Sequence, residues 1–114
     1  MNDYRILIVD DEARMCAVLK AALEPEGYAI ATATSGTAAI NALDTHAFEL
    51  VLTDLKMDEP GGMEVLRFAK QRQPQCEVIL MTAYATAQTA VDAMKNGAYD
   101  YIIKPFELDE LKLK

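Results

Sequence analysis

Residues 48–54 have the sequence Phe-Glu-Leu-Val-Leu-Thr-Asp, a short apolar run that ends in a carboxylate, Asp54. A run of this length and composition is typical of a strand buried on both faces of a sheet. Residues 5–9 form a second such run, and Asp10 and Asp11 follow it directly. Carboxylates that end the strands of a parallel sheet lie at the edge where open α/β folds place their ligand sites.

Runs of this kind recur along the chain, and a helical pattern separates each from the next. The predicted strands are residues 5–9, 28–33, 48–53, 77–82 and 99–103.

Apolar residues recur at helical spacing between these runs. The first helical stripe is stopped by Pro25 and Gly27. Ser35 is a favoured cap for a helix that extends to about residue 45, and another helix is expected at residues 62–72. We expect the apolar stripes to face the core. Their residues are Met15, Val18, Leu19, Ala22 and Leu23, then Val65, Leu66 and Ala69, and finally Ala87, Ala90, Val91 and Met94.

Strict alternation of strands and helices requires right-handed crossovers, which place helices on both faces of a parallel sheet. The predicted fold is therefore a doubly wound α/β fold, a flavodoxin-like three-layer sandwich with a five-stranded parallel sheet in the order 2-1-3-4-5. The first and third strands are then neighbours, so Asp10 and Asp11 are expected beside Asp54. We expect a single domain over residues 1–114, whose short last helix from Leu108 suggests the N-terminal fragment of a longer protein.

The composition, with 52% hydrophobic and 25% charged residues, is that of an ordinary globular domain. The formal net charge of −7 argues against direct binding to nucleic acid, because a cationic surface releases the counterions there. Cys16 and Cys76 lack metal-ligand spacing, and we expect buried free thiols rather than a disulfide. With no apparent secretion signal or membrane span, these thiols favour a cytoplasmic location.

The three carboxylates are candidates for a cation site, because their mutual repulsion favours a bound cation. Ligands that are all oxygen select a hard ion, and Mg²⁺ fits best with carboxylate oxygens, a backbone carbonyl and waters. Asp54 is then a candidate nucleophile that forms an acyl phosphate. Lys104 supplies a positive charge to the transferred group, and Thr82, at the end of the fourth strand, can donate a hydrogen bond.

Four motifs carry a resemblance to a known family. They have the sequences Ile-Leu-Ile-Val-Asp-Asp-Glu at residues 6–12, Val-Leu-Thr-Asp-Leu-Lys-Met at 51–57, Ile-Leu-Met-Thr-Ala-Tyr at 79–84 and Tyr-Ile-Ile-Lys-Pro-Phe at 101–106. With these motifs in this order, the chain resembles, over essentially its whole length, the receiver domain of bacterial two-component response regulators. Residues 81–101 further resemble the NtrC-type branch, transcription activators with an ATPase domain and a DNA-binding domain downstream.

The resemblance implies that Asp54 accepts a phosphoryl group from a phosphohistidine of a sensor histidine kinase. It also implies that Asp11 and Asp54 bind Mg²⁺ directly, that the backbone carbonyl of Lys56 is a third ligand, and that Asp10 acts mainly through water. Such a domain is a phosphoacceptor rather than an enzyme, and it catalyses only its own phosphorylation and dephosphorylation.

The resemblance also implies a switch. Thr82 and Tyr101 match the family's switch pair, and Lys104 matches its phosphate-binding lysine, followed by a cis bond to Pro105. Phosphorylation is expected to draw in Thr82 and leave space for Tyr101 to turn inward, which changes the surface of the fourth helix, fifth strand and fifth helix. This change would control output domains of the same parent chain and a phosphorylation-dependent homodimer. The fourth helix is the expected mobile element because it is rich in alanine: Ala85, Ala87, Ala90, Ala93 and Ala98.

One position departs from the family pattern. Receivers usually carry proline four residues after the phosphoacceptor, and this chain has Asp58 there, with Pro60 two positions later and Gly62 in its expected place. The geometry of this loop and its fit to a kinase are therefore open.

Other interpretations remain at this stage. Taken singly, Asp11 is an equally good cap for the first helix, Asp54 a turn residue and Lys104 a solvated lysine. A haloacid-dehalogenase-like phosphatase would need a second Asp two residues after its nucleophile on the first strand, where this chain has Glu12. A flavodoxin-like cofactor binder would need a phosphate loop that an acidic triplet would repel. A phosphorylation-independent protein-interaction module on the same fold is the alternative that remains hardest to exclude.

Overall fold

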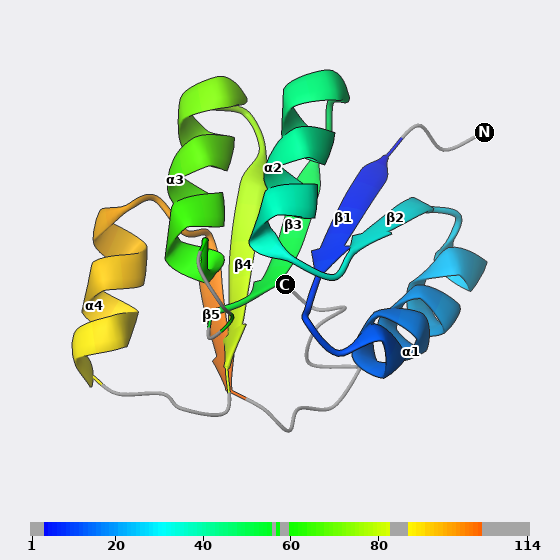
Figure 1. The fold of residues 1–114 in the computed structure, drawn as a ribbon, viewed down its shortest axis with the longest axis horizontal. Helices are drawn as coiled ribbons and strands as arrows, with labels where there is room; N and C mark the ends of the chain where they lie inside the picture. The colour runs from blue at the N-terminus through cyan, green and yellow to red at the C-terminus, as the bar shows by residue number, and fades with distance from the viewer. Residues whose placement is uncertain (1–3, 56, 58–59, 83–86, 104–114) are drawn as a thin grey trace.

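The computed structural model describes residues 4–55, 57, 60–82 and 87–103, which form an α/β fold (Figure 1). Five parallel strands make one sheet in the order β2-β1-β3-β4-β5, which confirms the predicted order. The strands are β1 (Arg5–Val9), β2 (Ala29–Ala33), β3 (Leu50–Asp54), β4 (Glu77–Thr82) and β5 (Asp100–Ile103). The helices are α1 (Ala13–Leu23), α2 (Gly36–Thr45), α3 (Gly62–Arg72) and α4 (Ala87–Lys95), with a short 3₁₀ helix, η1, at Glu24–Glu26.

The predicted strand limits agree with the structure to within two residues, and the largest difference is at β3. This strand begins at Leu50 and includes Asp54, whereas the sequence predicted a strand over residues 48–53. The backbone N–H of Phe48 donates to the side-chain oxygen of Gln73 at 2.9 Å, so this residue belongs to the turn before the strand.

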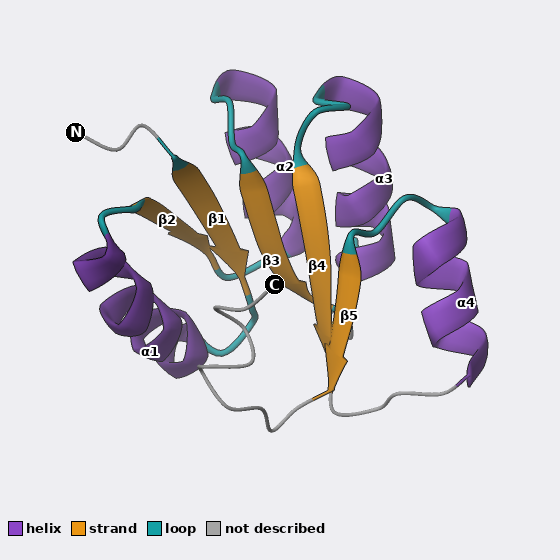
Figure 2. Ribbon diagram, turned by 180° about the vertical axis from the view of Figure 1, so that it is seen from behind, coloured by secondary structure: helices purple, strands orange, loops and turns teal. Residues whose placement is uncertain are grey.

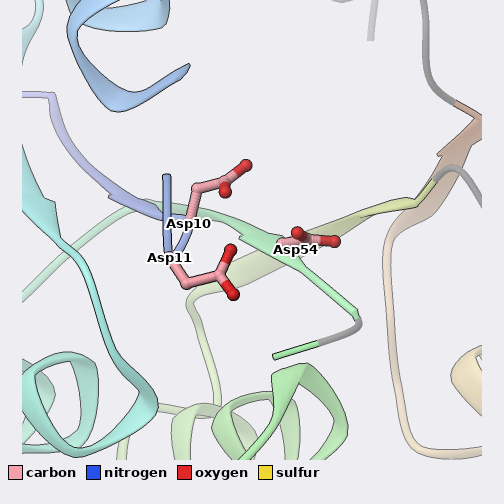
Figure 3. Close-up of side chains that lie close together, drawn as sticks. All are labelled: Asp10, Asp11 and Asp54. Carbon is pink, nitrogen blue, oxygen red and sulfur yellow. The ribbon is translucent and has the colours of Figure 1, made fainter. Parts of the chain in front are cut away.

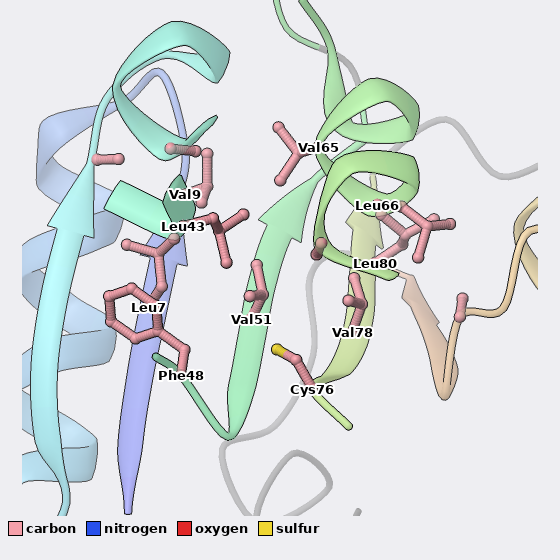
Figure 4. Packing of buried hydrophobic residues seen from close by; sticks show 14 of the residues in the cluster. Leu7, Val9, Leu43, Phe48, Val51, Val65, Leu66, Cys76, Val78 and Leu80 are labelled. Carbon is pink, nitrogen blue, oxygen red and sulfur yellow. The ribbon is translucent and has the colours of Figure 1, made fainter. Parts of the chain in front are cut away.

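Helices cover both faces of the sheet. Helix α1 packs on one face, and α2, α3 and α4 pack on the other (Figures 1 and 2). Side chains alternate between the faces along each strand, so Leu7 and Val9 of β1 point to the second face, and Ile6 and Ile8 point towards α1. Figure 4 shows the packing of the core on the second face, where Leu7, Val51 and Leu80 of the sheet meet Leu43 of α2 and Leu66 of α3. This arrangement confirms the predicted three-layer sandwich.

Two helix boundaries follow directly from local chemistry. The Ser35 hydroxyl oxygen accepts a hydrogen bond from the backbone N–H of Ala38 at 3.0 Å, which caps α2 as predicted. After α1, the chain makes η1 around Pro25 and then turns at Gly27, whose φ of 96° is in the left-handed region that favours glycine.

The predicted inward face of α3 is correct, since Val65, Leu66 and Ala69 are fully buried. In α1 the prediction is wrong for Val18, which is 50% exposed, whereas Cys16 is buried beside Leu19 and Leu23. The buried stripe of α1 is narrower than the apolar pattern, and Val18 lies on its flank.

The predicted inward face of α4 is wrong. Val91 is 46% exposed and Met94 is 52% exposed, whereas Ala93 is fully buried. Ala98, expected in this helix, follows it and packs in the same core as Ala93. Small residues let α4 approach the sheet closely, so its larger apolar side chains face outward.

The two cysteines are free and buried in the structure, as predicted. Within the described residues, no helix combines the length and the apolar character needed to cross a membrane. The helix expected from Leu108 lies outside the described residues.

Candidate functional site

Three carboxylates meet at the carboxyl end of the sheet. One oxygen from each of Asp10, Asp11 and Asp54 lies within 4.8 Å of the others, and Figure 3 shows the three side chains together. Asp10 is fully buried, Asp54 is 9% exposed and Asp11 is exposed. The structure therefore brings together the cluster that the sequence predicted from strand adjacency.

The pairing of β1 with β3 places this cluster. Val9 lies opposite Thr53 in the parallel register, so the next residues along the two strands are Asp10 and Asp54. The N–H of Asp10 donates to the carbonyl of Ala33 in β2 at 3.1 Å. The backbone hydrogen bonding between β1 and β2 thus continues one residue past β1 and fixes the position of Asp10.

Asp54 is held from the other side by β4. It lies opposite Met81, and the N–H of Leu55 donates to the carbonyl of Met81 at 2.8 Å. Asp54 is therefore the last residue of a buried strand, and its interpretation as a turn residue is wrong.

The turn from β1 into α1 uses Asp10 rather than Asp11. The Oδ1 atom of Asp10 accepts a hydrogen bond from the N–H of Glu12 at 3.0 Å. Glu12 is the N-cap residue of α1 and makes no side-chain cap hydrogen bond. The alternative role of Asp11 as a helix cap is wrong, and its carboxylate is directed to the cluster.

Two glycines let the chain close tightly around the end of β3. A Cβ atom on Gly62 would overlap the carbonyl oxygen of Asp54 and lie 2.6 Å from the Cα of Leu55. A Cβ atom on Gly36, at the start of α2, would overlap the backbone of Pro60. Pro60 therefore packs against the start of α2, a contact that the sequence did not predict.

The two predicted switch residues lie on one face of the sheet. Thr82 ends β4 and is fully buried, and Tyr101 in β5 is half-buried opposite Leu80. Because side chains alternate along a strand, Leu80 and Thr82 point to the same face, which is also the face of Tyr101. The Tyr101 hydroxyl is hydrogen bonded to the Thr89 hydroxyl of α4 at 2.8 Å.

Sequence reasoning gave Thr89 no role. Its position was the available signal, because it precedes the buried Ala93 by one helical turn and therefore lies on the same side of α4. Lys56 and Lys104, predicted as a metal ligand and as the phosphate-binding lysine, lie outside the described residues.

The donor set of the cluster fits a divalent cation. All three side chains offer carboxylate oxygens, which hard cations prefer, and two of them are buried where charge repulsion is screened least. A cation between them would offset that repulsion. Among the described residues, the group of side chains close enough to share an ion consists of these three carboxylates and includes no sulfur or imidazole.

Comparisons with known proteins identify the family. Residues 6–114 match the family model of the response regulator receiver domain. The chain is 44% identical over 108 residues to the transcriptional regulatory protein ZraR of Klebsiella oxytoca, covering 95% of this chain and 24% of that protein. It is 41% identical over 109 residues to the alginate biosynthesis transcriptional regulatory protein AlgB of Pseudomonas aeruginosa, covering 96% of this chain and 24% of that protein. The chain thus spans about a quarter of the length of these NtrC-type relatives.

Solved structures show the same fold. A CheY-like receiver domain protein of Methanospirillum hungatei superposes with a TM-score of 0.94 at 32% identity, covering 98% of this chain and 90% of that one. A response regulator of Burkholderia pseudomallei superposes with a TM-score of 0.91 at 29% identity, covering 96% of this chain and 65% of that one. Its structure has a phosphorylated aspartic acid, a calcium ion and citrate. Together with the family match over residues 6–114, these findings establish that the chain belongs to the response regulator receiver domain family.

Proposed function

We propose that Asp54 is the phosphoacceptor of this receiver domain and takes its phosphoryl group from a phosphohistidine of a sensor histidine kinase. The observation that carries the proposal is the position of Asp54. It ends a central buried strand, and one of its carboxylate oxygens lies within 4.8 Å of oxygens of Asp10 and Asp11. The phosphorylated aspartic acid in the Burkholderia pseudomallei relative supports the same chemistry.

The cation in this proposal is Mg²⁺. Asp11 and Asp54 would hold it directly, the backbone carbonyl of Lys56 would be a third ligand, and Asp10 would act mainly through water. When bound, Mg²⁺ supplies positive charge that offsets the repulsion between the carboxylates and an incoming phosphoryl group. The calcium ion in the Burkholderia pseudomallei structure supports a divalent ion. A small set of protein ligands completed by waters is the usual way in which proteins bind Mg²⁺, and this favours Mg²⁺ here.

The transfer is a displacement at phosphorus. A carboxylate oxygen of Asp54 forms the new bond to phosphorus, the bond from phosphorus to the histidine nitrogen breaks, and the imidazole leaves with that electron pair. Lys104 is proposed to contact the transferred group. The domain is thus a phosphoacceptor that promotes only its own phosphorylation and the later hydrolysis of the acyl phosphate.

The output of the switch is proposed to be transcription activation by further domains of the parent protein. Thr82 and Tyr101 would respond to the phosphoryl group and change the surface around α4 and β5. The relatives are named as transcriptional regulators, which supports this output and a cytoplasmic location. The exposed Val91 and Met94 on α4 offer an apolar surface for a phosphorylation-dependent homodimer.

Intact mass spectrometry tests this function. The chain is incubated with acetyl phosphate or a phosphoramidate, with and without Mg²⁺, beside the variants Asp54→Asn and Asp92→Asn. Asp92 is a matched control because its Oδ1 accepts a hydrogen bond from Gln88 at 2.9 Å on α4, which an Asn oxygen also does. We expect one phosphoryl adduct in the native chain and in Asp92→Asn, and none in Asp54→Asn or without metal. If no donor or metal yields an adduct, the phosphorylation-independent interaction module becomes the better account.

A further inference from the structure

The hydrogen bond between Thr89 and Tyr101 joins α4 to β5, the two elements whose surface the proposed switch changes. Thr89 lies in the helix predicted to be mobile, and Tyr101 lies in the neighbouring strand, with 2.8 Å between their hydroxyl oxygens. Both side chains are partly buried, so water competes for this bond less than it would at the surface.

The packing around this bond shows where the Tyr101 side chain lies relative to α4 and Thr82. Tyr101 lies opposite Leu80 and packs against the core that contains Leu80 and Ala93, on the face that α4 covers. Thr82 is two residues beyond Leu80 on the same face, at the carboxyl end of the strand. The bond to Thr89 holds the Tyr101 hydroxyl against α4. If activation turns the ring away from α4 and towards Thr82, that bond is lost.

We propose that Thr89 is a positioning residue that holds Tyr101 against α4 in the unphosphorylated domain. By stabilising this arrangement, it lowers the fraction of molecules that already have the activated arrangement before phosphorylation. This inference rests on the proposed function, and it adds a residue that sets how strongly the switch is biased. A ligand that binds the activated arrangement then binds more weakly by the same factor as the population is reduced.

The test uses three variants of the chain. Thr89→Val removes the hydroxyl and keeps the branched shape, whereas Thr89→Ser keeps a hydroxyl and should behave as the native chain. Thr37→Val makes the same change at an exposed threonine in the first turn of α2. The first measurement is the nuclear magnetic resonance spectrum of ¹³C-labelled tyrosine rings without metal or phosphoryl donor, with the Tyr101 signals assigned by their loss in Tyr101→Phe.

The second measurement is a titration with beryllofluoride, a phosphoryl mimic, in the presence of Mg²⁺. In Thr89→Val we expect the Tyr101 ring signals of the free protein to shift towards their positions in the beryllofluoride-saturated native chain. We also expect beryllofluoride to bind about 2- to 10-fold more tightly, the population change that follows from losing one neutral hydrogen bond. In a Tyr101→Phe background, Thr89→Val should change the beryllofluoride affinity much less than it does in the native background, because the bond to Tyr101 is already absent.

Ring signals in Thr89→Val that match the native chain would overturn the inference. A shift of those signals with native affinity for beryllofluoride would also overturn it, because the bond would then be structural without biasing the switch. A native chain that does not bind beryllofluoride contradicts the proposed function instead. The ring signals of the free protein still decide, in that case, whether Thr89 positions Tyr101.

Discussion

At the scale of single residues, the position of Asp54 is fixed by backbone contacts packed closely around the end of β3. Its strand is bonded to β4 through Leu55 and Met81, and the N–H of Gly62 donates back to the carbonyl of Leu55 at 3.1 Å. The backbone of α3 therefore begins in direct contact with the end of β3. A side chain at residue 62 would displace the carboxylate that the proposed chemistry needs.

We predict that Gly62→Ala destabilises the domain by roughly 1–3 kcal/mol, because the new Cβ meets backbone atoms that cannot move aside. Phosphorylation by acetyl phosphate should slow as well, since the end of β3 shifts. Gly61→Ala is the matched control, because its Cβ would have its nearest neighbours at 3.5 Å, an ordinary contact distance. Urea denaturation measures the stability, and equal losses in the two variants would contradict the steric explanation.

Cys76 gives a pH-dependent prediction at the same scale. Burial raises the pKa of its thiol to about 11, although Lys70 nearby lowers it in part. The unfolded chain ionises this thiol near pH 9, so the folded state binds more protons between these values and stability falls as pH rises through that range. The contribution is fully present below about pH 9 and amounts to roughly 2–3 kcal/mol when lost.

Urea denaturation of the native chain and Cys76→Ala between pH 7 and pH 10.5 tests this point. The free energy of unfolding should fall more steeply with pH in the native chain than in the variant. Cys76→Ala lowers the stability at every pH by creating a cavity, so only the slope is diagnostic. Parallel slopes would show that Cys76 does not titrate on unfolding.

At the scale of elements, one side chain joins three segments at the amino end of the sheet. The amide nitrogen of Gln73, the C-cap residue of α3, donates to the carbonyls of Leu43 and His46 at 2.7 Å each. Its oxygen accepts from the N–H of Phe48 at 2.9 Å. The side chain thus provides hydrogen-bond partners for backbone groups at the end of α2 and in the turn that leads into β3.

We predict that Gln73→Glu destabilises the domain by roughly 1–3 kcal/mol near neutral pH, because a carboxylate cannot donate to the two carbonyls. Gln71→Glu, at an exposed position of the same helix, adds the same charge without this loss. Urea denaturation of both variants separates the two effects. If their stabilities are equal, the hydrogen bonds of Gln73 contribute nothing measurable.

The elements also show what sequence patterns can predict. Apolar runs predict the limits of β1 and β4 to the residue, because strands buried on both faces need little beyond hydrophobicity. The pattern fails for α4, whose buried residue is Ala93 rather than Val91 or Met94. Helix orientation is set by which residues allow close approach to the sheet, and a stripe of large apolar residues does not report that.

The candidate site also has features that the sequence predicts and features that it does not. Strand order predicts that Asp10, Asp11 and Asp54 meet, because neighbouring parallel strands end at the same edge of the sheet. The bond between Thr89 and Tyr101 and the contact of Gly36 with Pro60 depend on how helices pack against loops and strands. Such contacts join residues far apart in sequence that have no shared pattern, so the sequence alone does not indicate them.

At the scale of the whole molecule, the exposed apolar residues of α4 give a prediction about assembly. Val91 is 46% exposed on α4, and Val18 is 50% exposed on α1. We expect Val91→Lys to weaken the dimer of the phosphorylated or beryllofluoride-bound domain, because it places a charge in an apolar contact. Val18→Lys makes the same change at equal exposure on a different helix and should leave the dimer intact.

Sedimentation velocity with and without beryllofluoride measures this effect. The native domain should be a monomer alone and dimerise with the mimic bound. A dimer that Val18→Lys weakens and Val91→Lys does not would place the contact on the opposite face of the sheet. A domain that remains monomeric with beryllofluoride bound would contradict the proposed homodimer.

The central claim is that the phosphoryl group is carried by the carboxylate of Asp54. The most direct measurement is borohydride reduction of the phosphorylated chain, followed by mass spectrometry of its peptides, because borohydride converts an aspartyl phosphate to homoserine. We predict homoserine at residue 54 alone, and only after incubation with a phosphoryl donor and Mg²⁺. Homoserine at another carboxylate, or a phosphorylated chain that borohydride leaves unchanged, would contradict the account.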